Sequence, residues 1–304
     1  MKLAKEFYKL PLTFDVGQLK KEVLLFSEQD WTAHHESFKG NSAIPLVSVN
    51  GEFNNDFKGP MSSTTALTRC KYIQQVIASF GEVIGRSRLM RLAPGAEVPV
   101  HSDINYHWYK RVRIHIPIIT EPTVQFYCAD KQVHMAAGEC WIFDSWKYHR
   151  VANDSDCYRV HLVIDIAGSS RFWNMVNNES AHLEHDYVAQ IATRHLSVSS
   201  QNSNEFKTEK VNFPIIMPPA EVELLSKDLL EEIAKYSLND FSDVEQFSQC
   251  LTSFYYDWRE LWSQYESEQQ GWPLYHQLRE KLMRQVSELN DRVKIDGATS
   301  ATKI

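Results

Sequence analysis

Two histidines and an aspartate have types and spacing that suit a metal site. His101 and Asp103 are two residues apart, so in an extended segment one imidazole and one carboxylate project in the same direction. His149 follows a later β-rich run, and an antiparallel barrel can bring such distant strand ends together. Two imidazoles and a carboxylate form the facial triad that leaves open positions on iron(II). The alternative reading of His-x-Asp is a hydrogen-bonded surface pair.

Arginine and histidine alternate with aliphatic residues along two predicted strands. In residues 112–119, Arg113 and His115 share one face, and in residues 158–166 Arg159 shares a face with His161. An arginine on so apolar a strand needs an anionic partner, and its planar fork suits a carboxylate. We interpret these polar faces as the lining of a cavity for a dianion, with the aliphatic faces packed under helices. Half-exposed strands whose arginines pair with surface acids are the alternative.

The elements that position these residues are mainly short strands separated by turn residues, which predicts a mainly β core with helices. A double-stranded β-helix, the cupin-like jelly roll, is the arrangement we expect. Residues 1–85 mix helical and irregular signals, with a helix predicted over residues 71–80. The strands are predicted at residues 88–92, 112–119, 124–128, 132–135, 141–143, 150–152 and 158–166.

The sequence changes in character after Gly168. We therefore predict a β domain over residues 1–168 and a mostly helical region over residues 169–304, with a polar Ser/Asn-rich loop near residues 195–210. Helices are predicted over 220–236 and 243–293, with a break at Gly271-Trp-Pro273. The aromatic cluster from Phe254 to Tyr265 indicates a helical core or an interface, and we expect a homodimer through it.

Composition excludes several classes of protein. The 304 residues are 43% hydrophobic and 23% charged, which is ordinary globular usage. The formal net charge of −7 disfavours a nucleic-acid binder. No run approaches the ~20 apolar residues of a membrane span, and the N-terminus lacks the apolar core of a signal peptide. Five cysteines without a Cys-x-x-Cys pair favour reduced thiols in a cytoplasmic protein.

Two stretches resemble the metal motifs of a known family. Residues 88–103 and residues 138–149 are similar to the first and second metal motifs of the aspartyl/asparaginyl β-hydroxylases. Residues 112–116 and Arg159 fall where that family holds its cosubstrate. The family consists of iron(II)- and 2-oxoglutarate-dependent dioxygenases on a double-stranded β-helix, and the resemblance covers about a quarter of the chain.

The resemblance implies a role for each of these residues. His101, Asp103 and His149 would bind iron(II). Arg159 would pair with the distal carboxylate of 2-oxoglutarate, and His115 and Arg113 would assist it. No protein residue beyond the metal site is expected to be catalytic.

The implied reaction consumes O₂ and 2-oxoglutarate and hydroxylates an unactivated C–H bond. The expected substrate is an amino acid or an amino-acid-like molecule, with peptidyl Asp or Asn included. Residues 104–111 form a longer spacer than in the peptide hydroxylases of the family, so a peptide substrate does not carry over. The alternatives are a cupin-like metalloprotein without 2-oxoglutarate chemistry and a non-catalytic binding module. Arg159 distinguishes the dioxygenase from a cupin-like metalloprotein such as a hydrolase, because a hydrolase has no evident need for an arginine at this position.

Overall fold

The chain forms two compact units in the computed structural model. The structure describes residues 1–33, 38–184, 193–201 and 203–295. The first unit comprises Met1–Asn212 and the second comprises Phe213–Ile304. The boundary between the two units therefore lies between Asn212 and Phe213. The change in sequence character had placed it at residue 168. The cause is that the segment after Gly168 returns to the β domain through helix α5 (Ser170–Glu184) and two short strands.

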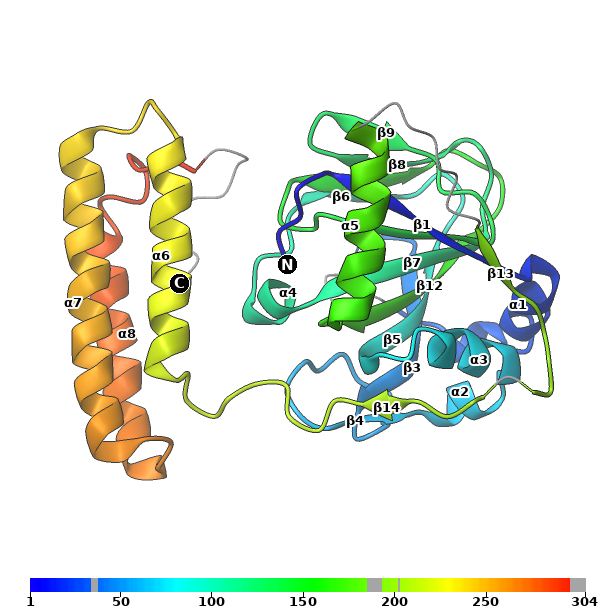
Figure 1. Ribbon diagram of the computed structural model, residues 1–304, viewed down its shortest axis with the longest axis horizontal. Helices are drawn as coiled ribbons and strands as arrows, with labels where there is room; N and C mark the ends of the chain where they lie inside the picture. Colours follow the sequence, from blue (N-terminus) through cyan, green and yellow to red (C-terminus); the bar gives the residue numbers. More distant parts are fainter. Residues whose placement is uncertain (34–37, 185–192, 202, 296–304) are drawn as a thin grey trace. The chain divides into compact units, whose positions relative to one another are not determined.

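The first unit is a jelly roll of two sheets, so the predicted fold class is confirmed (Figure 1). The larger sheet has the strand order β13-β1-β10-β7-β12-β5-β3-β2, with β4 on β3 and β14 on β5, and the smaller sheet has the order β6-β11-β8-β9. The strands are β1 (Phe7–Phe14), β2 (Thr32–Ala33), β3 (Asn41–Val49), β4 (Met61–Ser63), β5 (Val83–Leu92), β6 (Glu97–His101), β7 (Val112–Ile119), β8 (Val124–Cys128), β9 (Lys131–Val133), β10 (Glu139–Phe143), β11 (His149–Asn153), β12 (Arg159–Ile166), β13 (Arg194–Leu196) and β14 (Lys207–Thr208).

The aliphatic face of the larger sheet packs under helices, as the alternation predicts. The aliphatic residues of β7 and β12 are buried in one cluster with residues of α1 (Val16–Val23), α3 (Lys71–Ser79) and α5. A short α2 (Thr65–Thr68) precedes α3, and η1 (Glu28–Asp30) precedes β2. With its aliphatic face covered in this way, the polar face of the sheet is turned toward the smaller sheet.

Four strands, β1 to β4, were not expected in the first 85 residues. The two long ones, β1 and β3, each contain a proline, Pro11 and Pro45, and a proline inside a β-rich run argues against a strand. In both strands the proline lies at an irregularity of register, between Leu10 and Thr13 in β1 and between Pro45 and Val47 in β3. Such bulges tolerate a residue that cannot donate a ladder hydrogen bond.

The predicted polar loop near residues 195–210 is instead anchored to the larger sheet. β13 pairs with β1 and β14 pairs with β5, in both cases in parallel. Directly after β14, the buried Glu209 accepts hydrogen bonds from Arg111 Nε at 2.7 Å and from Arg111 Nη2 at 2.8 Å. This segment is therefore part of the β domain rather than a linker.

The second unit is helical, as predicted. It consists of α6 (Pro219–Lys235), α7 (Phe241–Tyr265), the 3-10 turn η2 (Gln269–Gly271) and α8 (Trp272–Val286). Phe254 and Trp258 are buried in its core, whereas Tyr256 is exposed. The long helix ends at Tyr265, the next residue Glu266 has a φ of 46°, and the chain resumes a helix with Pro273 in its first turn. The homodimer expected through these helices stays a prediction.

Among the described residues, no helix combines the length and the apolar character needed to cross a membrane.

The Arg111–Glu209 pair makes a prediction about stability. Glu209→Ala leaves the Arg111 guanidinium buried without its carboxylate, which typically costs about 3–5 kcal/mol. We expect a loss of that order in the free energy of unfolding, measured by denaturant titration. Glu223→Ala is the matched control, because its i,i+4 pair with Lys227 is exposed and such pairs contribute about 0.3–0.5 kcal/mol. Equal stability of the two variants would contradict the structural role of Glu209.

Candidate functional site

The structure brings His101, Asp103 and His149 together. One ligand atom from each of the three residues lies within 4.8 Å of the others. The two imidazole ring centroids are 4.2 Å apart, and His149 Nε2 lies 3.9 Å from Asp103 Oδ2. This is the donor set of the predicted facial triad, and its atoms are close enough to share one ion.

Pairing within the smaller sheet creates this proximity. β11 pairs with β6 so that His149 stands opposite His101. Asp103 follows β6, and its backbone N–H donates to the carbonyl of Ser145 at 2.8 Å. A buried Asn153 at the far end of β11 donates to the carbonyls of Leu92 and Ala93. The smaller sheet is thereby held to the end of β5.

Backbone carbonyls select the ring nitrogens that face the metal position. His101 Nδ1 lies 2.8 Å from the carbonyl of Pro99, and His149 Nδ1 lies 2.9 Å from that of Lys147. A proton on each Nδ1 leaves each Nε2 as a free lone pair, the arrangement common among metal-binding histidines. Burial lowers the pKa of His149 to about 4, so at neutral pH this imidazole is neutral and able to bind a cation.

The triad faces a cavity of about 130 Å³ between the two sheets. His115, Arg113 and Arg159, the three residues predicted to hold the cosubstrate, also line this cavity. Its wall further includes Phe38, Asn41, Phe57, Arg86, Arg88, Met90, Val98, Asn105, Trp108, Phe126, Phe143, Ser145 and Val151.

Arg159 is buried without an acidic partner. Its Nη2 lies 3.1 Å from His161 Nδ1, and its guanidinium lies over the ring of Phe126 at 4.8 Å. Among the described residues no carboxylate pairs with it, and its Nε has no hydrogen-bond partner. Burial lowers the pKa of Arg159 to about 9. Both ring nitrogens of His115 are likewise buried without partners, so the cavity presents polar atoms that a bound anion can satisfy.

Arg113 differs, because the structure gives it a partner inside the protein. Its Nε and Nη2 donate to the two carboxylate oxygens of Asp165 at 2.7 and 3.0 Å. Its guanidinium also lies 4.3 Å above the ring of Trp108. The expected contact between Arg113 and the cosubstrate therefore stays a prediction, and the observed role of Arg113 is in a buried ion-pair network.

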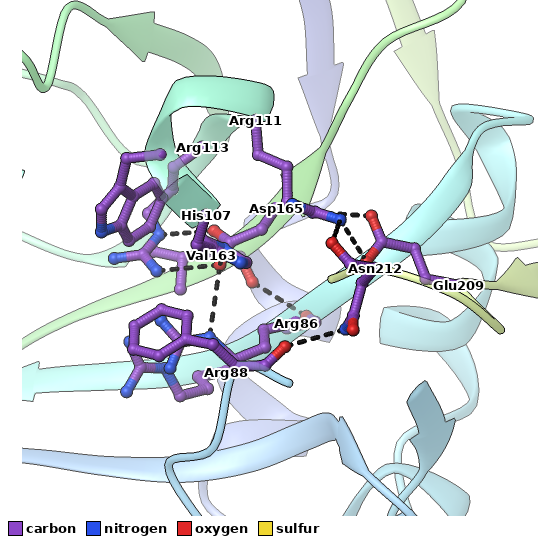
Figure 2. Close-up of polar contacts among 12 residues, drawn as sticks. Arg86, Arg88, His107, Arg111, Arg113, Val163, Asp165, Glu209 and Asn212 are labelled. Atoms are coloured by element: carbon purple, nitrogen blue, oxygen red, sulfur yellow. Dashed lines mark hydrogen bonds and ion pairs between the residues drawn. The ribbon is translucent and has the colours of Figure 1, made fainter. Parts of the chain in front are cut away.

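Asp165 is the centre of that network (Figure 2). Arg86 Nε lies 3.5 Å from Asp165 Oδ2, and His107 Nε2 lies 3.2 Å from the same atom. Although burial favours the neutral acid, Arg113 and His107 hold the pKa of Asp165 well below its usual range. Burial lowers the pKa of His107 to about 3, so the histidine is neutral and the carboxylate is balanced by arginines.

Sequence reasoning missed Arg86 and Arg88 as residues of the cavity. Both are buried on β5 and share the inner face of the larger sheet with Arg159 and Arg113. The signal was present, because residues 86, 88, 90 and 92 alternate with Ser87, Leu89 and Arg91 just as the other two strands alternate. The predicted strand began only at Arg88, and its arginines were not assigned to a face.

The spacer over residues 104–111 contains a short helix, α4 (Tyr106–Lys110). The Asn105 side chain caps it by accepting from the Trp108 N–H. His107 and Trp108 are buried, and Asn105 and Trp108 line the cavity. This segment therefore forms a wall of the cavity rather than a solvated loop.

A jelly roll whose cavity is lined by a two-histidine, one-carboxylate donor set and by arginines is the class of domain that the fold and the site define. Within that class, residues 29–168 match the model of the family described as Aspartyl/Asparaginyl beta-hydroxylase. The resemblance found from the motifs is thus confirmed over this part of the chain. No curated protein matches the sequence.

Several solved structures are similar to the chain. A prolyl-4-hydroxylase from Pseudomonas putida is 13% identical, with 54% of this chain and 92% of that chain covered and a TM-score of 0.37. A prolyl hydroxylase from Trichoplax adhaerens, in complex with a hypoxia-inducible-factor peptide, is 12% identical over 59% of this chain and 87% of that one, with a TM-score of 0.38. A cupin domain from Bordetella pertussis is 18% identical, with 41% and 92% covered and a TM-score of 0.24.

The geometry of the triad makes a prediction about metal binding. Asp103→Ala removes the only charged ligand of the three, so we expect at least a tenfold loss of manganese(II) affinity while the fold is kept. Anaerobic titration followed by electron paramagnetic resonance measures the affinity. Asp130→Ala is the matched control, because Asp130 is exposed and pairs with Lys131. Unchanged affinity in Asp103→Ala would remove Asp103 from the site.

Proposed function

We propose that the protein is an iron(II)- and 2-oxoglutarate-dependent dioxygenase that hydroxylates an unactivated C–H bond. One observation carries this proposal: the His101–Asp103–His149 triad and Arg159 line the same cavity, and Arg159 is buried there without an acidic partner among the described residues. A metal site alone fits many activities. A guanidinium held in the same cavity without a partner supports a carboxylate cosubstrate, because an unpaired buried charge is costly for the protein to keep.

The residues present fit both groups. The Nε2 atoms of His101 and His149 and the carboxylate of Asp103 would hold iron(II), which supplies the activation of O₂ when it is bound with 2-oxoglutarate. Arg159 would hold the distal carboxylate through its planar fork. His115, whose ring nitrogens have no partner, would donate a further hydrogen bond. Phe126 and Phe143 line the same space and exclude water from it.

The role of this chain in the reaction is to hold and orient, and no protein residue is assigned as a general acid or base. The burial of Arg159 strengthens its attraction for a carboxylate, because water screens a buried charge less. The substrate we propose is an amino acid or amino-acid-like molecule, with a peptidyl Asp or Asn as a less favoured form. The hydroxylase family of residues 29–168 supports this reaction class.

Binding of the two groups can be tested before the substrate is known. Protein loaded anaerobically with iron(II) and titrated with 2-oxoglutarate should develop a visible metal-to-ligand charge-transfer band that requires both additions. His149→Ala should abolish the band because the metal loses a ligand. A folded, iron-binding protein without the band would favour a cupin-like metalloprotein instead. Failure to bind iron at all would favour a non-catalytic module.

Arg159 makes a separate prediction. Arg159→Ala should raise the 2-oxoglutarate concentration needed for half of the charge-transfer signal by about 10- to 150-fold, because a hydrogen-bonded charge contributes about 1.5–3 kcal/mol. The iron(II) affinity measured without 2-oxoglutarate should stay the same. Arg150→Ala is a suitable control, since Arg150 is half-buried on β11 and pairs with Glu97. An unaltered requirement for 2-oxoglutarate in Arg159→Ala would show that the inner face has been assigned wrongly.

A further inference from the structure

The cavity contains a second buried guanidinium that the proposed function does not use. Arg88 is 3% exposed, and its Nη1 donates to the side-chain oxygen of Asn55 at 3.2 Å. Asn55 is neutral, and among the described residues no acid forms an ion pair with Arg88. Its Nε has no hydrogen-bond partner, and burial lowers the pKa of Arg88 well below its ordinary value.

Within the described residues Arg88 has no ion-pair partner, and Arg86 and Arg113 oppose the attraction that Asp165 and Asp103 exert on it from a distance. Asp165 is the carboxylate of the inner face, and it is already bound by both nitrogens of Arg113 and approached by Arg86. Arg86 is fixed further by the ring of Phe57, 3.7 Å from its guanidinium carbon, and by the carbonyl of Asn55 at 3.1 Å. Two carboxylates, Asp165 and Asp103, therefore act on the guanidinium groups of Arg86, Arg88 and Arg113, and Asp103 belongs to the candidate metal site.

The cosubstrate does not supply the missing negative charge. In the register of β5 against β12, Arg88 stands opposite Val163 and Arg159 stands opposite Leu92. The two arginines are therefore four residues apart along this pair of strands. At about 3.4 Å per residue, their backbone positions are roughly 14 Å apart along the strands. In the proposed function 2-oxoglutarate turns one carboxylate to Arg159 and the other to the metal. Neither carboxylate remains for Arg88.

We propose that Arg88, supported by Arg86, is the subsite that binds the carboxylate of a small substrate. This inference rests on the proposed function and names its substrate class. The cavity of about 130 Å³ is small compared with the roughly 300–1,000 Å³ of pockets for drug-sized ligands. Arg88 is inside it, so only a carboxylate that enters the cavity can reach the guanidinium. A free amino acid has such a group on its α-carbon, whereas the same residue inside a peptide has an amide in its place and keeps a carboxylate only if its side chain is acidic.

Asn55 and Phe57 place the guanidinium groups rather than neutralise them. Both residues lie in the segment between β3 and β4, and the ring of Phe57 also contacts that of His107 in a tilted arrangement, with the centroids 4.6 Å apart. Asn212 ties this segment down by donating to the carbonyl of Phe57 and accepting from the N–H of Gly59. The subsite is thereby preorganised, and a ligand does not have to order it on binding.

The subsite can be tested with an anion probe that needs no turnover. Crystals of the full chain, grown with manganese(II) and 2-oxoglutarate, are soaked in sodium iodide, and iodide is located by its anomalous scattering. We expect iodide against the Arg88 guanidinium in the wild type. Arg88→Gln should lose it. Arg91→Gln should keep it, because Arg91 lies on the other face of β5 and pairs with Glu28. Wild-type crystals without iodide at Arg88 would overturn the subsite.

The same crystals separate this inference from the proposed function. Density for 2-oxoglutarate on Arg159 without iodide on Arg88 removes the subsite and leaves the cosubstrate assignment. Iodide on Arg88 without 2-oxoglutarate on Arg159 removes the proposed function and leaves an anion site.

A kinetic experiment tests the substrate class. Succinate release is compared for free L-amino acids and for the corresponding carboxamides, which have the same side chains without the carboxylate. We expect turnover to be confined to the free acids, and Arg88→Gln to raise the KM of an accepted acid by about 10- to 150-fold, the effect of a lost hydrogen bond to a charged group. The half-saturating 2-oxoglutarate concentration should not change. Carboxamides that react as well as the acids would refute the proposal, and if neither series reacts the iodide result decides.

Discussion

The structure depends on how one buried carboxylate is shared among the arginines of an enclosed sheet face. Asp165 accepts from Arg113 on the neighbouring strand, lies close to Arg86 on the opposite neighbour and contacts His107 of α4. Without it, three strands would bring like charges together in a space that excludes water, where repulsion is strongest. With it, β5, β7 and β12 are joined through their side chains as well as their backbones. The short helix that carries Trp108 is fixed to the same point.

Asp165 does not balance the charge of every arginine in the cavity. Among the described residues, neither Arg159 nor Arg88 forms an ion pair. Replacing a buried ion by apolar residues often stabilises a protein, so the retention of two such groups lowers stability. Elsewhere the same fold avoids this cost: the equally buried Arg111 has Glu209 as a two-point partner. The contrast between Arg111 and the two cavity arginines indicates that the cavity, rather than the fold, requires their free charges. Such a trade of stability for binding is common at functional sites.

The alternation of residues in β7 and β12 was sufficient to predict both strands and the face that their polar residues share, because period-two patterning has one structural solution. The triad was suggested by the spacing of His101 and Asp103 and by the later strand before His149, and the family resemblance was needed to assign the three residues to one metal site. Other features leave no local trace. β1 and β3 were missed because Pro11 and Pro45 sit at bulges, which only a paired sheet reveals. Glu209 lies in a Ser/Asn-rich stretch, and its pairing with Arg111 depends on a chain reversal that no sequence window contains.

The two halves of the site belong to different sheets and are fixed by different constraints. The triad depends on the register that puts His149 opposite His101, and a slip of one residue would turn one imidazole to the other face. The arginines of the cavity depend on the register of β5 and β7 against β12. Asn153 connects the two, because it ties the end of β11 to the carbonyls at the end of β5. The distance between the triad and the arginines is therefore set by the closure of the jelly roll. This explains why the site requires the whole β domain rather than any one motif.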